Sequence, residues 1–251
     1  MNVKLISYTR PVEVLEDGTI LHSNMTAEEL IVYIARVSSN QHTENYQKLL
    51  TYLIKNKHWS PFEMVDITFE IITSRAIGTQ LLRHRSFSFQ EFSQRYAEAT
   101  EIEPISLRKQ AEKNRQSSTE EFDPMINSLN YPDITHSASH ATQNLITTSK
   151  LLYHQLIKDG VARECARMIL PLATQTKIYM KGSLRSWIHF LEVRDDDHAQ
   201  KEVRDIAIEI RKTLESIFPV TFAAIAEMKQ EQEEMKDYAE KWKAQFVTPY
   251  E

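Results

Sequence analysis

Glycine is scarce in this chain, and its scarcity limits the nucleotide-binding turns that the chain can form. Only four of the 251 residues are glycine, and they lie far apart, at Gly18, Gly78, Gly160 and Gly182. A GxGxxG turn or a P-loop needs several glycines within a few residues. The chain therefore contains neither turn, and if it binds a dinucleotide, it does not use the Rossmann fingerprint.

The overall composition is that of an ordinary globular protein, with 41% hydrophobic and 26% charged residues. No apolar run approaches the roughly 18 residues that a bilayer-spanning helix needs. Met1–Arg10 is too short and polar for a signal peptide, so we expect a cytoplasmic protein. Because Cys165 is the single cysteine, an internal disulfide and a cysteine-based zinc cluster are excluded.

The distribution of charge points to a small anionic ligand. The net charge of −5 argues against a general nucleic-acid-binding protein, because such domains usually carry a basic balance or a basic stripe. The basic residues are concentrated in Arg83–Arg95, Arg163–Arg167 and Lys181–Arg194. Local basic clusters in an acidic protein suggest a ligand such as phosphate. The alternative, that these residues only form surface salt bridges, stays open.

The pattern of apolar residues predicts one domain over residues 1–251, without internal repeats or a separating linker. In Val65–Ile71 every second residue is apolar, which indicates a half-buried strand. Further strands are expected at Asn2–Tyr8 and Thr174–Lys181. Helices are expected after a capping box formed by Thr26 and Glu29, and over His42–Lys57, Ser74–Arg85, Thr135–Lys158, Val161–Ile169, Ser183–Val193, Ala199–Phe218 and Pro219–Trp242.

Three segments are less regular. Ser86–Arg95 is expected to be a loop. Glu101–Tyr131 is polar and without clear periodicity, so we interpret it as a variable excursion, partly helical at Leu107–Asn114. The charged C-terminal helix is expected to be solvated and to pack through four apolar residues, Phe222, Ile225, Met235 and Trp242.

The most informative segment is Arg83–Arg95, which contains Arg-His-Arg, seven residues, Ser, one residue and Arg. Five fixed residues at this spacing would occur by chance in roughly one chain of this length in ten thousand. The pattern resembles the signature of the flavin-dependent thymidylate synthases, and every fixed position of that signature is filled.

Further elements resemble the same family in the same order. One is His58-x-Ser60-Pro61-Phe62-Glu63, and a second is Glu164-x-x-Arg167-x-x-Leu170-Pro171-Leu172. The last comprises Arg185-Ser186, Phe190-Leu191 and Arg194-x-x-x-His198-Ala199-Gln200. The resemblance extends from about His58 to Arg204 and does not include Glu101–Tyr131 or the C-terminal stretch.

The resemblance implies an α+β fold with helices packed on a small β-sheet. It also implies an enzyme that methylates dUMP to dTMP with FAD, with NADPH as reductant and 5,10-methylenetetrahydrofolate as carbon donor. The family further implies a homotetramer with active sites shared between subunits. No metal, nucleic-acid or membrane partner is expected.

Site residues follow from the matching positions. For dUMP, the resemblance implies Gln80, Arg83, Glu91, Ser93, Gln94, Arg95, Arg167 and Arg194. Arg194 takes the catalytic role, because a guanidinium beside the uracil can stabilise negative charge on N3 or O4. For FAD, it implies Ser60, Arg83, His84, Arg85, Glu91, Ser183, Arg185 and His189. His189 stands where many relatives carry asparagine, and both side chains can donate a hydrogen bond.

Several residues also have other interpretations. Ser93 is preferred as a binding residue over a nucleophile, because no activating relay is visible. The run from Asp195 to His198 resembles a metal cluster, but Asp197 with Gln200 also fits a helix cap, which we prefer. His136 and His140 have metal-ligand spacing without a supporting carboxylate nearby, so surface histidines are preferred.

Two rival functions remain open. Cys165 would be the nucleophile of an unrelated type of transferase, but its apolar neighbours favour a small residue of the core. The segment Arg83–Tyr96, in which arginines alternate with aromatic residues, would suit single-stranded nucleic acid. The net negative charge counts against this second alternative.

Overall fold

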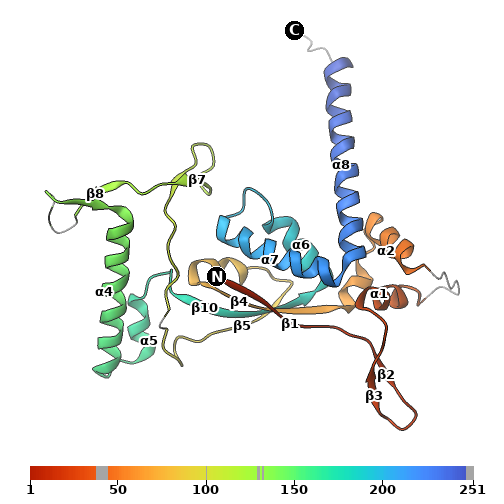
Figure 1. The fold of residues 1–251 in the computed structure, drawn as a ribbon, viewed down its shortest axis with the longest axis horizontal. Coiled ribbons are helices and arrows are strands. Elements are labelled where there is room, and N and C mark those ends of the chain that lie inside the picture. The colour runs from red at the N-terminus through yellow and green to blue at the C-terminus, as the bar shows by residue number, and fades with distance from the viewer. Residues whose placement is uncertain (38–44, 100, 129–130, 132, 247–251) are drawn as a thin grey trace. The chain divides into compact units, whose positions relative to one another are not determined.

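The computed structural model describes residues 1–37, 45–99, 101–128, 131 and 133–246 (Figure 1). Its strands are β1 (Asn2–Tyr8), β2 (Val12–Val14), β3 (Ile20–His22), β4 (Asp66–Ser74), β5 (Ser88–Glu91), β6 (Arg108–Gln110), β7 (Ser118–Glu121), β8 (Met125–Asn127), β9 (Thr135–Ser137) and β10 (Gln175–Ser183). Its helices are α1 (Ala27–Ala35), α2 (Tyr46–Lys55), α3 (Arg75–Leu81), α4 (Ala138–Lys158), α5 (Arg163–Ala166), α6 (Leu184–Arg194), α7 (Lys201–Ile217) and α8 (Pro219–Phe246), with short 3-10 helices η1 (Ser60–Met64) and η2 (Arg167–Ile169). The predicted α+β class is confirmed.

The chain divides into two compact units, each assembled from three separate stretches. The first unit contains Met1–Ser7, Thr68–Gly182 and Ser186–Glu209. The second unit contains Tyr8–Ile67, Ser183–Arg185 and Ile210–Glu251. Neither unit is a continuous piece of the sequence. That the whole chain forms one domain stays a prediction.

A four-stranded sheet, in the order β1-β4-β10-β5, is the framework of the fold. The alternation at Val65–Ile71 lies in β4, whose residues Ile67, Phe69 and Ile71 are completely buried. β10 alternates in the same way. β5 pairs antiparallel with β10 and places Glu91 opposite Ile178. The strands predicted at Asn2–Tyr8, Val65–Ile71 and Thr174–Lys181 are confirmed, with ends that differ by at most three residues.

The two central strands each end at a serine that leads directly into a helix. The Ser74 side chain accepts a hydrogen bond from the amide of Ile77 at 3.4 Å and caps α3. α3 lies close to β10, because a Cβ added at Gly78 would be 3.0 Å from Cγ2 of Thr176. Ser183 is the last residue of β10 and directly precedes α6. These junctions fix where the residues after α3 and along α6 leave the sheet.

An aromatic cluster in the first unit packs beneath α6. Trp187 is completely buried. The centroid of its ring lies 5.0 Å from that of Phe69 and 4.6 Å from that of Phe87, and both pairs are edge to face. Phe190 joins the cluster at 5.6 Å from Trp187. A Cβ at Gly182 would lie 2.5 Å from the Phe87 ring, so only glycine fits there. The cluster anchors both the segment after α3 and the helix α6.

A buried carboxylate links α1 to the start of α8 in the second unit. The predicted capping box of Thr26 and Glu29 is present, so the entry of α1 is fixed. The same first turn carries Glu28, which is 2% exposed and accepts hydrogen bonds from Thr221 N at 2.7 Å and Thr221 Oγ1 at 2.8 Å. Burial raises the pKa of Glu28. Glu28 therefore satisfies amide groups that α8 cannot pair within itself.

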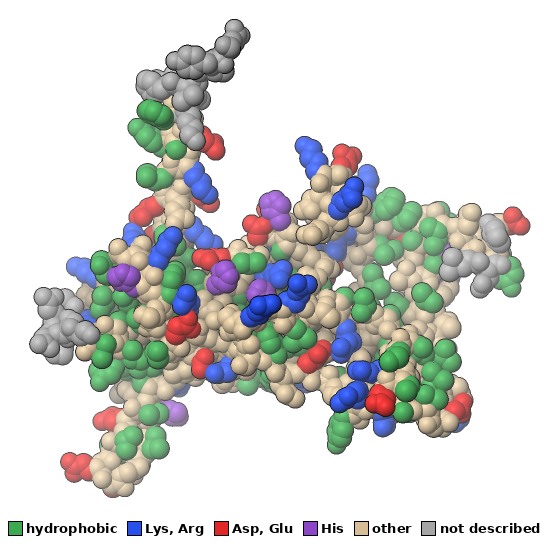
Figure 2. Space-filling model, turned by 180° about the vertical axis from the view of Figure 1, so that it is seen from behind, with side chains coloured by type: hydrophobic (Ala, Val, Ile, Leu, Met, Phe, Trp, Pro, Cys, Tyr) green, Lys and Arg blue, Asp and Glu red, His purple; other side chains and the backbone are tan. Residues whose placement is uncertain are grey.

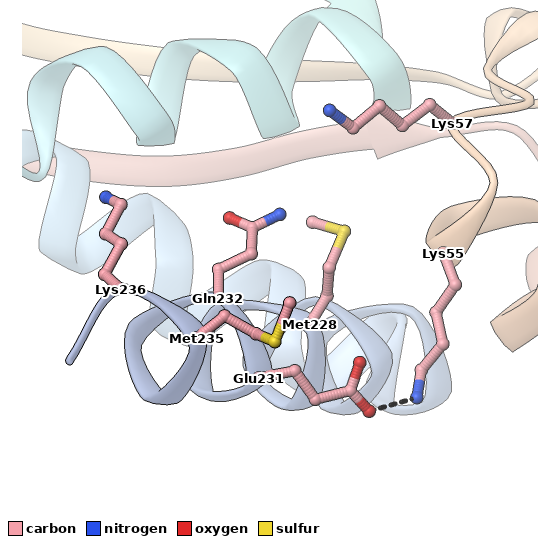
Figure 3. Close-up of a pocket in the computed structure, with 7 residues that line it drawn as sticks. All are labelled: Lys55, Lys57, Met228, Glu231, Gln232, Met235 and Lys236. Atoms are coloured by element: carbon pink, nitrogen blue, oxygen red, sulfur yellow. Dashed lines mark hydrogen bonds and ion pairs between the residues drawn. The ribbon is translucent and has the colours of Figure 1, made fainter. Parts of the chain in front are cut away.

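The second half of α8 does not pack as the sequence predicted. Phe222 and Ile225 are buried, as predicted, but Met235 is 71% and Trp242 51% exposed. A groove lies beside α8 (Figure 3). Its volume is about 430 Å³. Two methionines and five charged or polar side chains line it: Lys55, Lys57, Met228, Glu231, Gln232, Met235 and Lys236. None of these residues belongs to the predicted site.

Other boundaries differ from the sequence prediction. α3 ends at Leu81 instead of Arg85, and the loop predicted at Ser86–Arg95 contains strand β5. The partly helical segment predicted at Leu107–Asn114 is wrong, because β6 pairs there with β7. The long helix starts at Ala138, since Thr135–Ser137 is a strand paired with β8. The predicted start of the helix at His42 lies outside the described residues, and α2 begins at Tyr46.

None of the helices within the described ranges combines the length and the apolar character that crossing a membrane requires.

Candidate active site

The Arg-His-Arg sequence lies just past the end of α3, where the helix has unwound. Leu82 is the C-cap, and the His84 amide donates to the Leu81 carbonyl at 3.1 Å. Arg83 and Arg85 are exposed, whereas His84 between them is half-buried. The turn thus presents two guanidinium groups to solvent and directs one imidazole into the first unit.

His84 meets Arg194, the residue predicted to be catalytic. Arg194 Nε donates a hydrogen bond to His84 Nε2 at 2.9 Å, across 110 residues of sequence. The imidazole also lies edge to face with Phe190 at 5.0 Å. Burial, and then the charge of Arg194, lower the pKa of His84 to about 4. His84 is therefore neutral near pH 7.

Glu91 and Gln80 are held by neighbours in the first unit. Oε1 of Glu91 accepts hydrogen bonds from Thr176 Oγ1 at 2.8 Å and from Arg75 Nη1 at 3.3 Å. Gln80 Nε2 donates to Gln200 Oε1 at 2.6 Å. Gln200 lies just before α7, in the third motif element. These contacts show that segments far apart in the sequence lie next to one another in the first unit.

The segment after β5 forms a turn that exposes Ser93 and Arg95 and buries Gln94. The Ser93 carbonyl accepts hydrogen bonds from the amides of Tyr96 at 3.1 Å and Ala97 at 3.0 Å. Gln94 is 4% exposed, and its Nε2 has no hydrogen-bond partner in the described part of the chain. A buried amide without a partner is costly. Gln94 is thus a donor that a ligand acceptor could satisfy after a small rearrangement.

Five of the motif arginines make no salt bridge to the described residues, whereas Arg185 pairs with Glu63 at 2.9 Å. Among the described residues, none of the five forms an ion pair: Arg83, Arg85, Arg95, Arg167 and Arg194. By contrast, Arg163 in one of the same basic clusters pairs with Glu98 at 3.2 Å. The interpretation of the clusters as surface salt bridges therefore fails for these five positions and holds for Arg185 and Arg163. Their guanidinium groups are available to an anion.

Two of the predicted flavin residues of the second unit, Ser183 and Arg185, donate hydrogen bonds to Glu63. Glu63 belongs to a family element of the sequence, but it was not predicted to be a site residue. Oε2 of Glu63 accepts from Ser183 Oγ at 2.5 Å, and its Oε1 accepts from Arg185 Nη1 at 2.9 Å. Ser60 is exposed, three residues earlier on η1. The sequence signal for Glu63 is its position as the final residue of the His-x-Ser-Pro-Phe-Glu element.

His189 lies on α6, four residues after Arg185, as predicted. It is 68% exposed and lies 3.6 Å from Glu192 through Nδ1. Residues four apart on a helix share a side. That His189 and Arg185 contact one ligand stays a prediction.

Cys165 is exposed, so the prediction of a small residue of the core is wrong. It lies on α5, a helix of four residues in which only Ala166 is buried. A segment this short cannot bury a continuous face. Exposure leaves open the reactivity of Cys165, which mutation can test.

The alternative metal sites acquire other partners. Asp196 accepts hydrogen bonds from the His198 amide at 2.8 Å and from its Nδ1 at 2.7 Å, and Asp197 pairs with Arg204 instead of capping α7. His140 contacts Asn144 at 3.0 Å through Nε2. In the described ranges, no group of three or more His, Cys, Asp or Glu side chains could hold a metal ion.

Figure 2 shows the distribution of charge over one face of the molecule. Lysine and arginine side chains alternate there with aspartate and glutamate side chains. A duplex- or strand-binding surface would instead gather cations along one track. The mixture of charges on the visible face therefore counts against the alternative of a protein that binds single-stranded nucleic acid.

Comparison with known proteins defines the class first. Residues 19–220 match the family described as "Thymidylate synthase complementing protein". This match includes every predicted site residue.

Individual relatives then define the family more narrowly. The chain is 49% identical to the flavin-dependent thymidylate synthase of Synechocystis sp. over 226 residues, 90% of this chain and 99% of the relative. It is 43% identical to a probable flavin-dependent thymidylate synthase of Paramecium bursaria Chlorella virus 1, over 87% of this chain and 96% of the relative. It is 33% identical to the flavin-dependent thymidylate synthase of Thermus thermophilus, over 86% of this chain and 78% of the relative. The chain belongs to the flavin-dependent thymidylate synthase family.

Proposed function

We propose that this protein is a flavin-dependent thymidylate synthase that methylates dUMP to dTMP. Its cofactor is FAD, its reductant is NADPH, and its one-carbon donor is 5,10-methylenetetrahydrofolate. The observation that supports this most strongly is a set of motif arginines without ion pairs, one of which is oriented by a neutral histidine. Family membership supports the same assignment.

Binding of dUMP is assigned to residues of the first unit. Arg83, Arg95 and Arg167 clamp the dianionic phosphate with charge-assisted hydrogen bonds, because no carboxylate in the described part of the chain forms an ion pair with them. The turn at Ser93 and the buried amide of Gln94 add polar contacts. Gln80 and Glu91, already fixed by neighbouring side chains, position the nucleotide.

Activation of the uracil is assigned to Arg194. Attack by uracil C5 on the one-carbon unit requires negative charge to develop on N3 or O4 of the ring. A positioned guanidinium stabilises that charge and makes C5 more nucleophilic. The Nη1 and Nη2 atoms of Arg194 make no hydrogen bond to the described residues, so they remain for the substrate.

Flavin binding is assigned to the other predicted residues. Arg83 and Arg85 are exposed and unpaired, as partners of a diphosphate must be. Ser60, Ser183, Arg185 and His189 provide further donors, with Glu63 holding two of them in place. This donor set fits an anionic cofactor with a polar ring edge. When bound, the reduced flavin supplies the hydride that completes the methyl group.

The number of electrons consumed determines the oxidation state of the folate product. Conversion of the transferred methylene to a methyl group consumes two electrons. If these come from NADPH, the folate leaves as tetrahydrofolate and is not oxidised. Detection of tetrahydrofolate together with dTMP and NADP⁺ in equal amounts would support the proposal, whereas dihydrofolate would contradict it.

The assembly that we propose is a homotetramer whose active sites are shared between subunits, as the family resemblance implies. Light scattering coupled to size exclusion would measure the mass against 29.3 kDa per chain. Two inactive variants altered at different site residues would regain activity when mixed if the sites are shared.

The direct test uses the visible absorption spectrum of the purified protein. Flavin bands that bleach when NADPH is added without oxygen, faster with dUMP present, would support the assignment. A colourless protein that takes up no added FAD would refute it, and binding of a single-stranded oligonucleotide would then be measured.

A further inference from the structure

The contact between His84 and Arg194 joins two residues to which the family pattern gives different ligands. His84 belongs to the predicted flavin set and Arg194 to the predicted nucleotide set. In the first unit their side chains are hydrogen-bonded at 2.9 Å. The described residues offer Arg194 no other hydrogen bond or ion pair, so His84 is what fixes its side chain.

The direction of this hydrogen bond determines the state of the imidazole. Arginine Nε carries one hydrogen and is never an acceptor. His84 Nε2 must therefore be unprotonated, and the single ring proton lies on Nδ1. The charged groups that act on the ring are Arg194 and His189, and both disfavour protonation. The imidazole packs edge to face against two aromatic rings, with centroid distances of 6.2 Å to Phe87 and 5.0 Å to Phe190.

The choice of Nε matters for what the guanidinium can do. A guanidinium has five N–H donors in one plane, of which Nε supplies one. A bond at Nε sets the plane and direction of the group while both Nη atoms stay free. These two atoms can bind an oxygen and its neighbour in a paired arrangement. Phe190 lies four residues before Arg194, on the same side of α6, so the helix and the imidazole fix the arginine from two directions.

We propose that His84 is a positioning residue: as a neutral acceptor it orients Arg194 through Nε, so that the Nη1–Nη2 edge faces the substrate. The role of Arg194 in this proposal depends on the proposed function, but the hydrogen bond and the tautomer do not. His84 then acts on turnover through Arg194, beyond any contact that it makes with a flavin.

A matched pair of substitutions separates orientation from flavin binding. In His84→Gln, Oε1 lies four bonds from Cα, as His84 Nε2 does, and can accept from Arg194. In His84→Asn, the acceptor lies one bond short, at the position of Nδ1. We expect kcat to fall about tenfold to a hundredfold in His84→Asn, the effect of misplacing a reacting group. His84→Gln should stay within about threefold, with equal flavin occupancy in both.

The controls make the result decisive. His140→Asn, an exposed histidine outside the site, should leave kcat and flavin content unchanged. If His84→Gln is as slow as His84→Asn, or if both lose flavin in proportion to activity, the positioning role is refuted.

A second measurement does not need activity. A ¹⁵N spectrum of the histidine rings at pH 7, without ligands, should show His84 protonated at Nδ1 and bare at Nε2, and Arg194→Lys should shift that Nε2 signal. The same tautomer should persist when dUMP is added. A charged ring, or a proton on Nε2, would refute the proposal even in an active enzyme. The expected tautomer in a protein that binds neither FAD nor dUMP would leave the hydrogen bond intact and refute only the proposed function.

Discussion

Removal of the Glu28 carboxylate should destabilise the second unit, because it caps α8 from a neighbouring helix. In Glu28→Ala, the amide and hydroxyl of Thr221 lose their acceptor inside the protein. Each buried donor left without a partner costs about 1–3 kcal/mol. Release of the buried charge offsets part of this loss, so we expect a net loss of about 2–3 kcal/mol.

The matched variant is Glu28→Gln, whose Oε1 can accept the same hydrogen bonds without a charge. The pKa of Glu28 is raised above its value of 4.5 in an unfolded chain, so the folded protein takes up a proton at higher pH than the unfolded one does. Wild type should therefore gain stability as the pH falls toward 4.5, and Glu28→Gln should not show this gain.

Thermal unfolding of the protein without ligands would measure both effects. For a chain of this size each kcal/mol shifts Tm by about 2–4 °C, so Glu28→Ala should unfold about 4–12 °C below wild type. Glu28→Gln should stay near wild type at pH 7. Equal Tm values for the alanine and glutamine variants would refute the cap, because only one of them keeps an acceptor.

Three further substitutions test the site. Arg194→Ala should lower kcat by about 10²–10³ with flavin occupancy unchanged, as loss of one electrostatic stabiliser does; loss of flavin instead would show a different role. Glu63→Gln should weaken flavin retention by removing the charged anchor of Ser183 and Arg185, and unchanged FAD affinity by titration would contradict that. Cys165→Ala should keep full turnover, and an inactive, folded variant would favour the thiolate mechanism.

Local signals in the sequence predicted the framework of the fold well. The alternation of β4 and the serine that caps α3 act within a few residues, so they are visible without tertiary context. β5 was not visible, because its four residues form a strand only by pairing with β10, almost 90 residues later. The β6–β7 hairpin was missed for the same reason, since its polar residues become strands only through the hydrogen bonds between β6 and β7.

The motif gives the order of the predicted site residues along the chain but not their arrangement in space. Spacing alone places Arg83, His84 and Arg85 in a row, whereas the end of α3 turns the histidine inward and the arginines outward. The contact of His84 with Arg194 depends on the packing of Phe87 and Phe190 around Trp187. Cys165 shows the reverse error, because apolar neighbours in sequence do not guarantee burial on a one-turn helix.

The structure holds two of its arginines in chemically different ways. In the second unit, Arg185 is paired with the carboxylate of Glu63 at 2.9 Å, which cancels much of its charge. In the first unit, Arg194 is held by the imidazole of His84, which is neutral because burial and Arg194 itself lower its pKa to about 4. A carboxylate at the position of His84 would orient Arg194 equally well, but it would weaken the attraction between the guanidinium and a developing oxyanion. A neutral acceptor gives orientation while preserving the full positive charge, which is what activation of a uracil requires.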